Sequence, residues 1–323
     1  LNLPVLCFPQ LLNDSCRKPT LHYSKTMLLY IVMSCISLIT TALNLLVIIS
    51  VSHFRQLHTP SNILLLSLAV SDFLVGLLLM PLEILRSTTC WVLGDFMCFL
   101  YWYLTGNITC VSIGNIVLIS VDRYVAICDP LHYSTRITVA KVKLSVCLCW
   151  FYAIFSISLY AKDYLIESGR YNSCYGECAF VINDIARTID LVLSFIFPIT
   201  VIIVLYMRVF VVAVSQARAM RSHVTAVTLQ CSLNQANKSE LKAARTLGIL
   251  VVVFLLCFCP YYCVSLIRED FSSVAPIVIS LFFSNSCLNP VIYALFYPWF
   301  RKALKLIVTL QILHSGSCEV SIL

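Results

Sequence analysis

Seven long apolar runs dominate this sequence of 323 residues. Each is long enough for a helix of ~20 residues, which is the length that crosses the ~30 Å hydrocarbon core of a membrane. Their approximate limits are 26–53, 61–86, 96–121, 141–160, 188–212, 246–267 and 274–297. Only 11% of the residues are charged, against ~25% in a soluble domain, so a water-facing surface could not be covered. The sequence therefore predicts an all-α membrane protein, a bundle of seven transmembrane helices.

The bundle is expected to span residues 26–297, between an N-terminal tail (1–25) and a C-terminal segment (298–323). The stretch from Pro298 to Leu310 can form an amphipathic helix that lies on the inner leaflet and contacts membrane lipids. One face would carry Trp299, Phe300, Leu304 and Ile307, and the other Arg301, Lys302 and Lys305.

The basic residues predict the orientation of the bundle. Of the 22 Lys and Arg residues, 14 follow the first, third, fifth and seventh apolar runs: Arg55, Arg123, Arg136, Lys141, Lys143, Arg208, Arg218, Arg221, Lys238, Lys242, Arg245, Arg301, Lys302 and Lys305. Positively charged loops stay in the cytosol, so the N-terminus is expected outside the cell and the C-terminus inside. The net charge of +7 then reflects topology and not nucleic-acid binding.

Two other classes of protein fit the sequence poorly. We find no internal repeat, no pair of broken helices and no charged pore lining, which argues against a transporter or a channel. No nucleophile–base pair and no metal constellation is apparent, so we do not expect an enzyme or a cofactor.

The third run continues to an acid–base pair at Asp122 and Arg123, followed by Tyr124. Thr105 lies eighteen positions before Arg123, which is five helical turns at ~3.6 residues per turn. The two residues therefore share a side of one helix near opposite faces of the membrane, and Thr109 lies one turn below Thr105.

Asp72 is one of two acids that fall well inside an apolar run. A charged group in hydrocarbon costs at least ~2.5 kcal/mol, so each is a candidate functional residue. With Asn44, Asn285 and Asn289, Asp72 could form a buried polar cluster around a sodium ion and water. A helix-packing hydrogen bond is an equally good explanation.

Asp190 is the second such acid. It lies about two turns into its helix, too deep for an N-cap, and Pro198 eight residues later opens the helix locally. Aromatic residues are expected at the same depth, where rings could stabilise an ammonium by cation–π contact, although core packing is the commoner role of any one ring. They are Tyr101, Tyr103, Phe195, Phe258, Tyr261, Tyr262, Phe282 and Phe283.

Cysteines at the expected outer side can form disulfides, because that compartment is oxidising. They are Cys7, Cys16, Cys90, Cys98, Cys174 and Cys178. A Cys98–Cys178 bond would tie the loop before the fifth helix over the mouth of the bundle, but the residues alone leave the pairing open. Asn13-Asp14-Ser15 is a glycosylation sequence in the outer tail, which makes Asn13 a candidate glycosylation site.

Over nearly its whole length the chain resembles the rhodopsin-like G-protein-coupled receptors. The matching features occur in order along the chain: Asn44, LAVSD ending at Asp72, Trp91, Cys98 with Cys178, Asp122-Arg123-Tyr124, Trp150, Pro198 with Tyr206, CFCP ending at Pro260, and NPVIY ending at Tyr293. Within that family, NSCLNPVIYALFYPWF from Asn285 to Phe300 is similar to the fingerprint of the trace amine-associated receptors. An opsin is excluded because no lysine lies between Phe271 and Phe300 to form a Schiff base.

The resemblance implies two disulfides, Cys16–Cys174 and Cys98–Cys178. It also implies a switch for a G protein, in which Arg123 pairs at rest with Asp122 and with Glu240, while Tyr206 and Tyr293 rearrange around Arg123 on activation. The implied partner is a stimulatory olfactory G protein that raises cyclic AMP, and the implied location is the plasma membrane of olfactory sensory neurons.

The sequence departs from its relatives at the position that normally binds the amine. Amine receptors carry an aspartate seven residues after the third-helix cysteine, and Thr105 stands there in this chain. Some fish-type members of the trace amine-associated group resemble this chain in carrying an acid on the fifth helix. We therefore assign the amine counter-ion to Asp190. The expected ligand-binding residues are Asp190, Thr105, Thr109, Ser194, Tyr261, Tyr262, Phe258 and Phe283.

Two points stay open in the sequence. A receptor for non-amine or neutral odorants would fit if Asp190 were neutral, or paired with Arg187 or Arg268. Glu83 could supply a second acid near the mouth of the bundle, but a salt bridge to Arg86 or plain solvation explains it equally well.

Overall fold

The computed structural model describes residues 6–11, 15–16, 25–166, 174–178, 184–222, 230–266, 275–314 and 317–319. Its α-helices are α1 (Lys25–His53), α2 (Pro60–Leu74), α3 (Met80–Thr88), α4 (Gly94–Cys128), α5 (Tyr133–Arg136), α6 (Val139–Ile166), α7 (Asp184–Asp190), α8 (Phe197–Ser222), α9 (Gln230–Leu266), α10 (Ala275–Phe296) and α11 (Pro298–Val308). Two π-helical segments join helices, η2 (Val75–Leu79) and η4 (Leu191–Ile196). Short 3-10 turns lie at η1 (Arg55–Leu57), η3 (Pro130–His132), η6 (Gln311–Leu313) and η7 (Ser317–Glu319).

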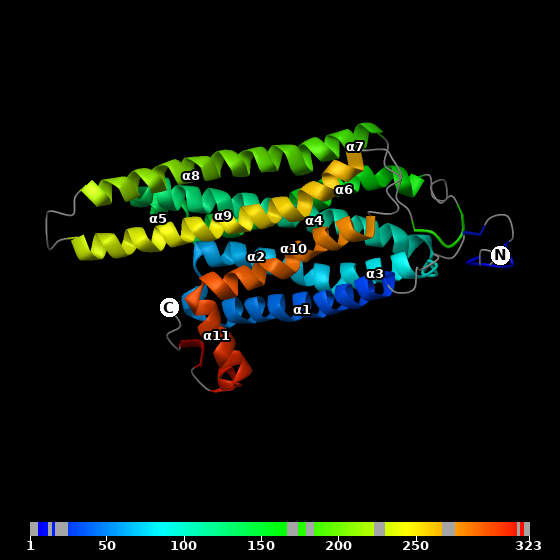
Figure 1. Ribbon diagram of the computed structural model, residues 1–323, viewed down its shortest axis with the longest axis horizontal. Helices are drawn as coiled ribbons and strands as arrows, with labels where there is room; N and C mark the ends of the chain where they lie inside the picture. Colours follow the sequence, from blue (N-terminus) through cyan, green and yellow to red (C-terminus); the bar gives the residue numbers. More distant parts are fainter. Residues whose placement is uncertain are drawn as a thin grey trace.

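The predicted seven-helix bundle is confirmed. Within the described ranges, seven helical stretches are long and apolar enough to cross a membrane. Two of them combine several elements, since α2 continues through η2 into α3 and α7 continues through η4 into α8. The helices lie side by side along the long axis of the molecule (Figure 1). The first begins at residue 25 and the last ends at 296, close to the expected limits of 26 and 297.

Both π-helical segments end just before a proline. Pro81 and Pro198 are each the second residue of the helix that follows, and a proline has no N–H to donate to the preceding turn. Gly76 in η2 also allows a close approach to α1. The hydroxyl of Ser37 donates to the Gly76 carbonyl at 2.7 Å, and a Cβ on Gly76 would lie 2.8 Å from the Thr41 hydroxyl.

The helix α4 forms the centre of the bundle. It packs against α2, α6, α8 and α9, and fourteen of its 35 residues are buried. One apolar cluster, which extends from the middle of the bundle to the residues that contact α11, contains Leu68, Ile116, Phe254 and Tyr293. A second cluster contains Leu79, Met80, Cys98 and Tyr101. Side chains on α4 therefore contribute to every level of the bundle.

Three disulfides gather at one end of the molecule, which we call the disulfide end. Cys16–Cys174 and Cys98–Cys178 are the two bonds that the resemblance implied, and Cys7–Cys90 adds a third. Backbone hydrogen bonds reinforce them, with the Trp91 N–H on the Gly176 carbonyl and the Cys16 N–H on the Tyr175 carbonyl, both at 2.9 Å. Residues 174–178 are thus fixed to the tail, to the loop before α4 and to α4 itself. Asn13 lies outside the described residues.

The opposite end, which we call the α11 end, is closed by α11. This helix turns away from the bundle axis after α10 (Figure 1). Trp299, Phe300 and Ala303 are buried against the bundle, whereas Arg301 and Lys302 are exposed. The Arg301 guanidinium donates to the carbonyls of residues 294 and 295 at 2.9 Å each, which satisfies the end of α10. The predicted amphipathic helix is therefore present from residue 298 to 308.

Candidate functional site

A cavity of about 290 Å³ opens at the disulfide end of the bundle. Residues of α4, α6, α7, η4, α9 and α10 line it. Six of its lining residues are aromatic: Phe99, Trp102, Tyr103, Tyr261, Tyr262 and Phe282. A small ligand with apolar or π-stacking groups fits such a wall, and a few polar groups would set its orientation.

Asp190 supplies the negative charge of this cavity. It is the last residue of α7, and its half-buried carboxylate accepts a hydrogen bond from Ser194 at 2.8 Å. The π-helical turn η4 places Ser194 beside it. Among the described residues no ion pair joins Asp190 to a cation, although Arg187 also lines the cavity. An acid that faces an aromatic cavity with one hydroxyl donor is suited to bind a cationic group.

The structure brings six of the eight expected ligand-binding residues to the cavity wall: Asp190, Thr105, Thr109, Ser194, Tyr261 and Tyr262. The Thr105 hydroxyl donates to the Tyr101 carbonyl at 2.8 Å, so it is already used within α4. Thr105 therefore contributes a neutral side chain, and no charge, to the cavity wall.

Phe258 and Phe283 do not line the cavity, which corrects their expected placement. Both side chains are 3% exposed. Phe258 lies behind Phe282, with ring centroids 4.7 Å apart, and it packs on Phe254. Phe283 belongs to the apolar cluster around Met80 and Tyr101. Their rings therefore support the wall, and Phe282 is the residue that reaches the cavity.

Sequence reasoning missed several lining residues of α4. These are Phe99, Trp102, Gly106 and Cys110, together with Tyr103, which was weighed only as a possible ring. Their spacing of three or four residues marks one face of a helix, the same face that carries Thr105 and Thr109. The periodicity of the third helix could have identified them once that face was assigned to the cavity.

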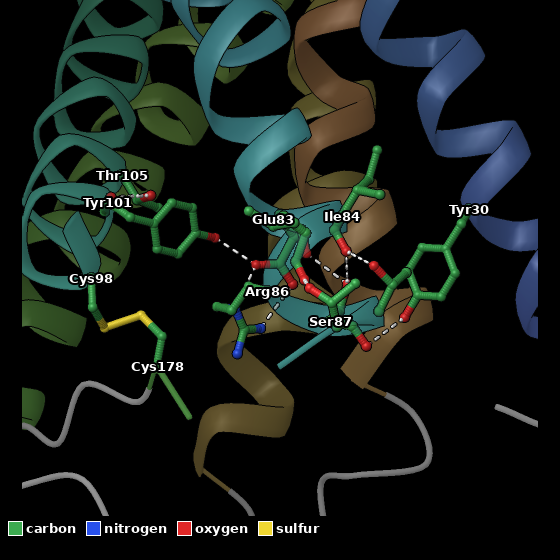
Figure 2. Close-up of polar contacts among 12 residues, drawn as sticks. Tyr30, Glu83, Ile84, Arg86, Ser87, Cys98, Tyr101, Thr105 and Cys178 are labelled. Atoms are coloured by element: carbon green, nitrogen blue, oxygen red, sulfur yellow. Dashed lines mark hydrogen bonds and ion pairs between the residues drawn. A yellow bond between two sulfur atoms is a disulfide. The ribbon is translucent and has the colours of Figure 1, made fainter. Parts of the chain in front are cut away.

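A second acid at the same end, Glu83, is fully paired. Its Oε2 accepts from the Tyr101 hydroxyl at 2.6 Å and from Arg86 Nε at 2.8 Å, and its Oε1 accepts from Arg86 Nη2 at 2.8 Å. Figure 2 shows Tyr101 and Arg86 converging on this carboxylate, which is 5% exposed. Of the roles considered for Glu83, the salt bridge to Arg86 is the one in the structure.

Glu83 and Arg86 face a second, smaller cavity of about 170 Å³ between α1, α3 and α10. The Arg86 guanidinium also lies 5.5 Å from the ring centroid of Trp102, a residue of the first cavity. The ion pair and the Trp102 ring therefore lie between the two cavities.

Two members of the expected polar cluster, Asp72 and Asn289, are in direct contact in the middle of the bundle. The amide of Asn289 donates to Asp72 Oδ2 at 2.7 Å, and the amide of Asn44 donates to the Ser286 carbonyl at 3.0 Å. Among the described residues, one side-chain oxygen of each expected member has no hydrogen-bond partner: Asn44 Oδ1, Asp72 Oδ1, Asn285 Oδ1 and Asn289 Oδ1. The side chain of Asn115, which the sequence did not indicate, is also buried without a partner in this part of the chain. Oxygen ligands of this kind suit a hard cation such as sodium, so the donor set fits the ion.

At the α11 end, Asp122 gathers three donors. Arg123 Nη2 lies 2.6 Å from Asp122 Oδ2, the Ser61 hydroxyl donates to the same oxygen at 2.8 Å, and the Tyr133 hydroxyl donates to Oδ1 at 2.8 Å. Burial, together with the negative charge of Asp122, raises the pKa of Tyr133, so this phenol stays protonated at neutral pH. The Asp122–Arg123 pair is thus held by α2 and by α5.

The other residues expected at this switch are placed only in part. Tyr293 is completely buried, its hydroxyl has no hydrogen-bond partner among the described residues, and its ring packs edge-on against Tyr297 with centroids 6.0 Å apart. Tyr206 packs against Gly248 of α9, and Tyr124 packs beside Ile127 and Val209. The side chain of Glu240 lies outside the described residues.

The comparisons of this chain with a family profile and with individual proteins agree on one family. A family profile described as "7 transmembrane receptor (rhodopsin family)" matches residues 43–293. The chain is 38% identical to trace amine-associated receptor 13c of Danio rerio, over 98% of this chain and 95% of that protein. It is 37% identical to trace amine-associated receptor 8a of Rattus norvegicus, over 98% and 96%, and 36% identical to trace amine-associated receptor 1 of Mus musculus, over 90% and 91%.

The Glu83 network predicts a difference between two tyrosines. Tyr101→Phe removes a hydrogen bond to a buried carboxylate and should destabilise the fold by about 1–3 kcal/mol. Tyr103→Phe, which removes an exposed hydrogen bond of 2.9 Å to Ser158, serves as the matched control and should change stability much less. Thermal unfolding of the purified protein in detergent measures both. Equal effects of the two changes would contradict the network's role.

Proposed function

Because the chain belongs to the rhodopsin family of G-protein-coupled receptors, and within it to the trace amine-associated receptors, we propose that it binds a protonated amine and signals through a stimulatory G protein. The chain is a receptor and not an enzyme. Its partners are a small-molecule ligand and a heterotrimeric G protein. The amine, the stimulatory type of G protein and the resulting rise in cyclic AMP are the parts that we propose.

One observation carries the choice of ligand. Asp190 presents a carboxylate to an aromatic cavity and has, among the described groups, a hydroxyl donor and no ion pair. A cation that enters the cavity would supply the missing opposite charge, and the faces of Tyr261 and Tyr262 would stabilise it further. Since Thr105 is neutral, this ammonium contact lies on the fifth transmembrane helix and not on the third.

The charge pattern and the family support a proposed orientation and cellular site. We place the disulfide end outside the cell, since the basic residues concentrate toward the α11 end and disulfides persist in an oxidising compartment. Asn13 would then be available for glycosylation. The receptor would act in the plasma membrane of olfactory sensory neurons, as one of the fish-type members that lack the third-helix acid.

Signalling would link the cavity to the α11 end through population shift. An amine that binds better to one conformation of the bundle favours that conformation. The cavity is bounded by α9 at Tyr261 and Tyr262, so a ligand can bias the position of α9 and of its far end. The outward swing of α9 would release Arg123 from Asp122, let Tyr206 and Tyr293 rearrange, and expose a groove for the G protein.

A receptor for neutral odorants is the second candidate. It would require Asp190 to be uncharged or paired. No ion pair with Arg187 is present among the described contacts, and Arg268 lies outside the described residues. Under this alternative only uncharged ligands would activate the receptor.

Asp190 gives the main test. In cells with a cyclic AMP reporter, Asp190→Asn and Asp190→Ala should weaken the response to an amine panel by about 30-fold or more, because truncating one member of a buried charge pair typically costs 2–5 kcal/mol. Asp95→Asn is the matched control, since it makes the same chemical change outside the cavity wall. Unchanged amine potency in both Asp190 variants, at equal surface expression, would exclude the assignment.

The pairing at Asp122 predicts a change in resting activity. Asp122→Asn should raise cyclic AMP without ligand, because weakening the resting state by about 1 kcal/mol shifts the ratio of active to resting receptor about 5-fold. Ser61→Ala retains the Asp122–Arg123 ion pair and removes only the hydroxyl that donates to Asp122, accepts from Arg123 and contacts Tyr133, so a smaller rise is expected. Basal signal per surface receptor is the measurement, and a signal that falls in Asp122→Asn would count against the switch.

We also propose that Asp72, Asn44, Asn285 and Asn289 hold a sodium ion that stabilises the resting conformation. Replacing potassium by sodium at constant ionic strength should then lower the amine affinity of the wild type by about 5-fold or more, a typical coupling between two sites. The Asp72→Asn variant should lose this sodium effect. A sodium effect of equal size in the wild type and in the variant would place the ion elsewhere.

A further inference from the structure

We propose that the Glu83–Arg86 ion pair makes this receptor selective for amines with one ammonium group over diamines. The inference rests on the proposed function, in which Asp190 binds the first ammonium. It assigns a specificity role to Arg86, a residue outside the wall of the first cavity. Two acids lie near that cavity, and their different surroundings decide how many positive charges a ligand can present.

The two acids lie in different parts of the disulfide end. Asp190 belongs to the fifth transmembrane helix and Glu83 to the second, and Trp102, which lines the cavity of Asp190, lies against the Arg86 that pairs with Glu83. A diamine of suitable length could in principle place one ammonium on each acid. That arrangement requires Glu83 to have a free oxygen and no neighbouring cation.

Glu83 meets neither requirement. Both of its oxygens are engaged, one by Arg86 and the other by Arg86 and Tyr101 together. The guanidinium binds through two parallel N–H···O contacts, which is the strongest geometry for this pair. The carboxylate is therefore neutralised from within the protein, and it is too deeply buried to gain a second cation without losing the first.

The surrounding turn keeps the pair in place. The Ser87 hydroxyl donates to the Glu83 carbonyl at 2.6 Å, and the Tyr30 hydroxyl of α1 donates to the Ser87 carbonyl at 3.3 Å (Figure 2). Arg86 also stacks over Trp102, whose ring lines the first cavity. The guanidinium thus places a positive charge directly behind the cavity wall. A second ammonium that approaches this wall would meet the guanidinium side of the pair and would find no unpaired carboxylate.

Wild-type receptor tests the inference without any substitution. Straight-chain monoamines and diamines of equal carbon number are compared in the cyclic AMP assay over a range of lengths. We expect each diamine to be at least about 10-fold weaker than its monoamine, because like charges placed together across an interface cost several kcal/mol. A diamine that is equal to or more potent than its monoamine, at any length, would overturn the proposal.

Two variants then identify the residues responsible. Arg86→Met replaces the arginine by an unbranched, uncharged side chain. The change removes the guanidinium and leaves Glu83 with Tyr101 as its remaining partner. It should reduce the ratio of diamine to monoamine EC50 by about 5-fold or more. The double variant Glu83→Gln/Arg86→Met also removes the acid that the single variant leaves without its arginine, so part of the wild-type ratio of EC50 values should return. Surface expression is measured for each variant.

The outcomes separate the two hypotheses. If monoamines activate the wild type through Asp190 but Arg86→Met leaves the ratio unchanged, the specificity role of Arg86 is wrong and the amine receptor stands. A reduced ratio that persists in the double variant would show that Glu83 is not the acid involved. If no amine activates the wild type while neutral odorants do, the proposed function itself fails. Where Arg86→Met does not reach the surface, the wild-type comparison decides alone.

Discussion

The cost of leaving a charge unpaired in hydrocarbon governs this structure. Apart from Asp95, which lies in the first turn of α4, four acids lie within the described membrane-spanning helices, and each is accommodated differently. Glu83 is paired with Arg86 and Tyr101, Asp122 with Arg123, Ser61 and Tyr133, and Asp72 accepts from Asn289 among oxygens that suit a cation. Asp190 has a hydroxyl and an open cavity. The acid with the least internal compensation is thus the one that an external cation can reach.

The helix α4 joins these sites into one unit. Tyr101 binds Glu83, Thr105 and Thr109 face the cavity, Asn115 lies in the buried core, and Asp122 ends the series at the opposite side of the membrane. Because the proposed ammonium contact lies on the fifth helix, α4 would sense a ligand by shape and packing and not by an ion pair of its own. The Cys98–Cys178 bond fixes α4 at the disulfide end, so this helix would provide the frame for the proposed swing of α9.

Much of the fold was predictable because helix formation in a membrane is imposed locally. With no water to pair the backbone, each apolar run must satisfy its own N–H and C=O groups, so run length alone gave the seven spans. Family resemblance supplied the pairings Cys16–Cys174 and Cys98–Cys178, which the residues by themselves left open. The site was predicted less fully. Phe258 and Phe283 were expected at the ligand, but the aromatic character of a residue does not tell which of two adjacent rings faces a cavity.

The sequence by itself determined that the chain forms seven membrane helices, and that Asp190 is an acid near aromatic residues in an apolar run. Both follow from composition and from spacing along a helix of known geometry. Only the tertiary structure decided that Phe282 forms the wall in front of Phe258, that Cys7 bonds to Cys90, and that Glu83 is occupied by Arg86 and Tyr101. These outcomes depend on the rotation of each helix about its axis and on contacts between distant segments, and periodicity within one helix does not contain that information.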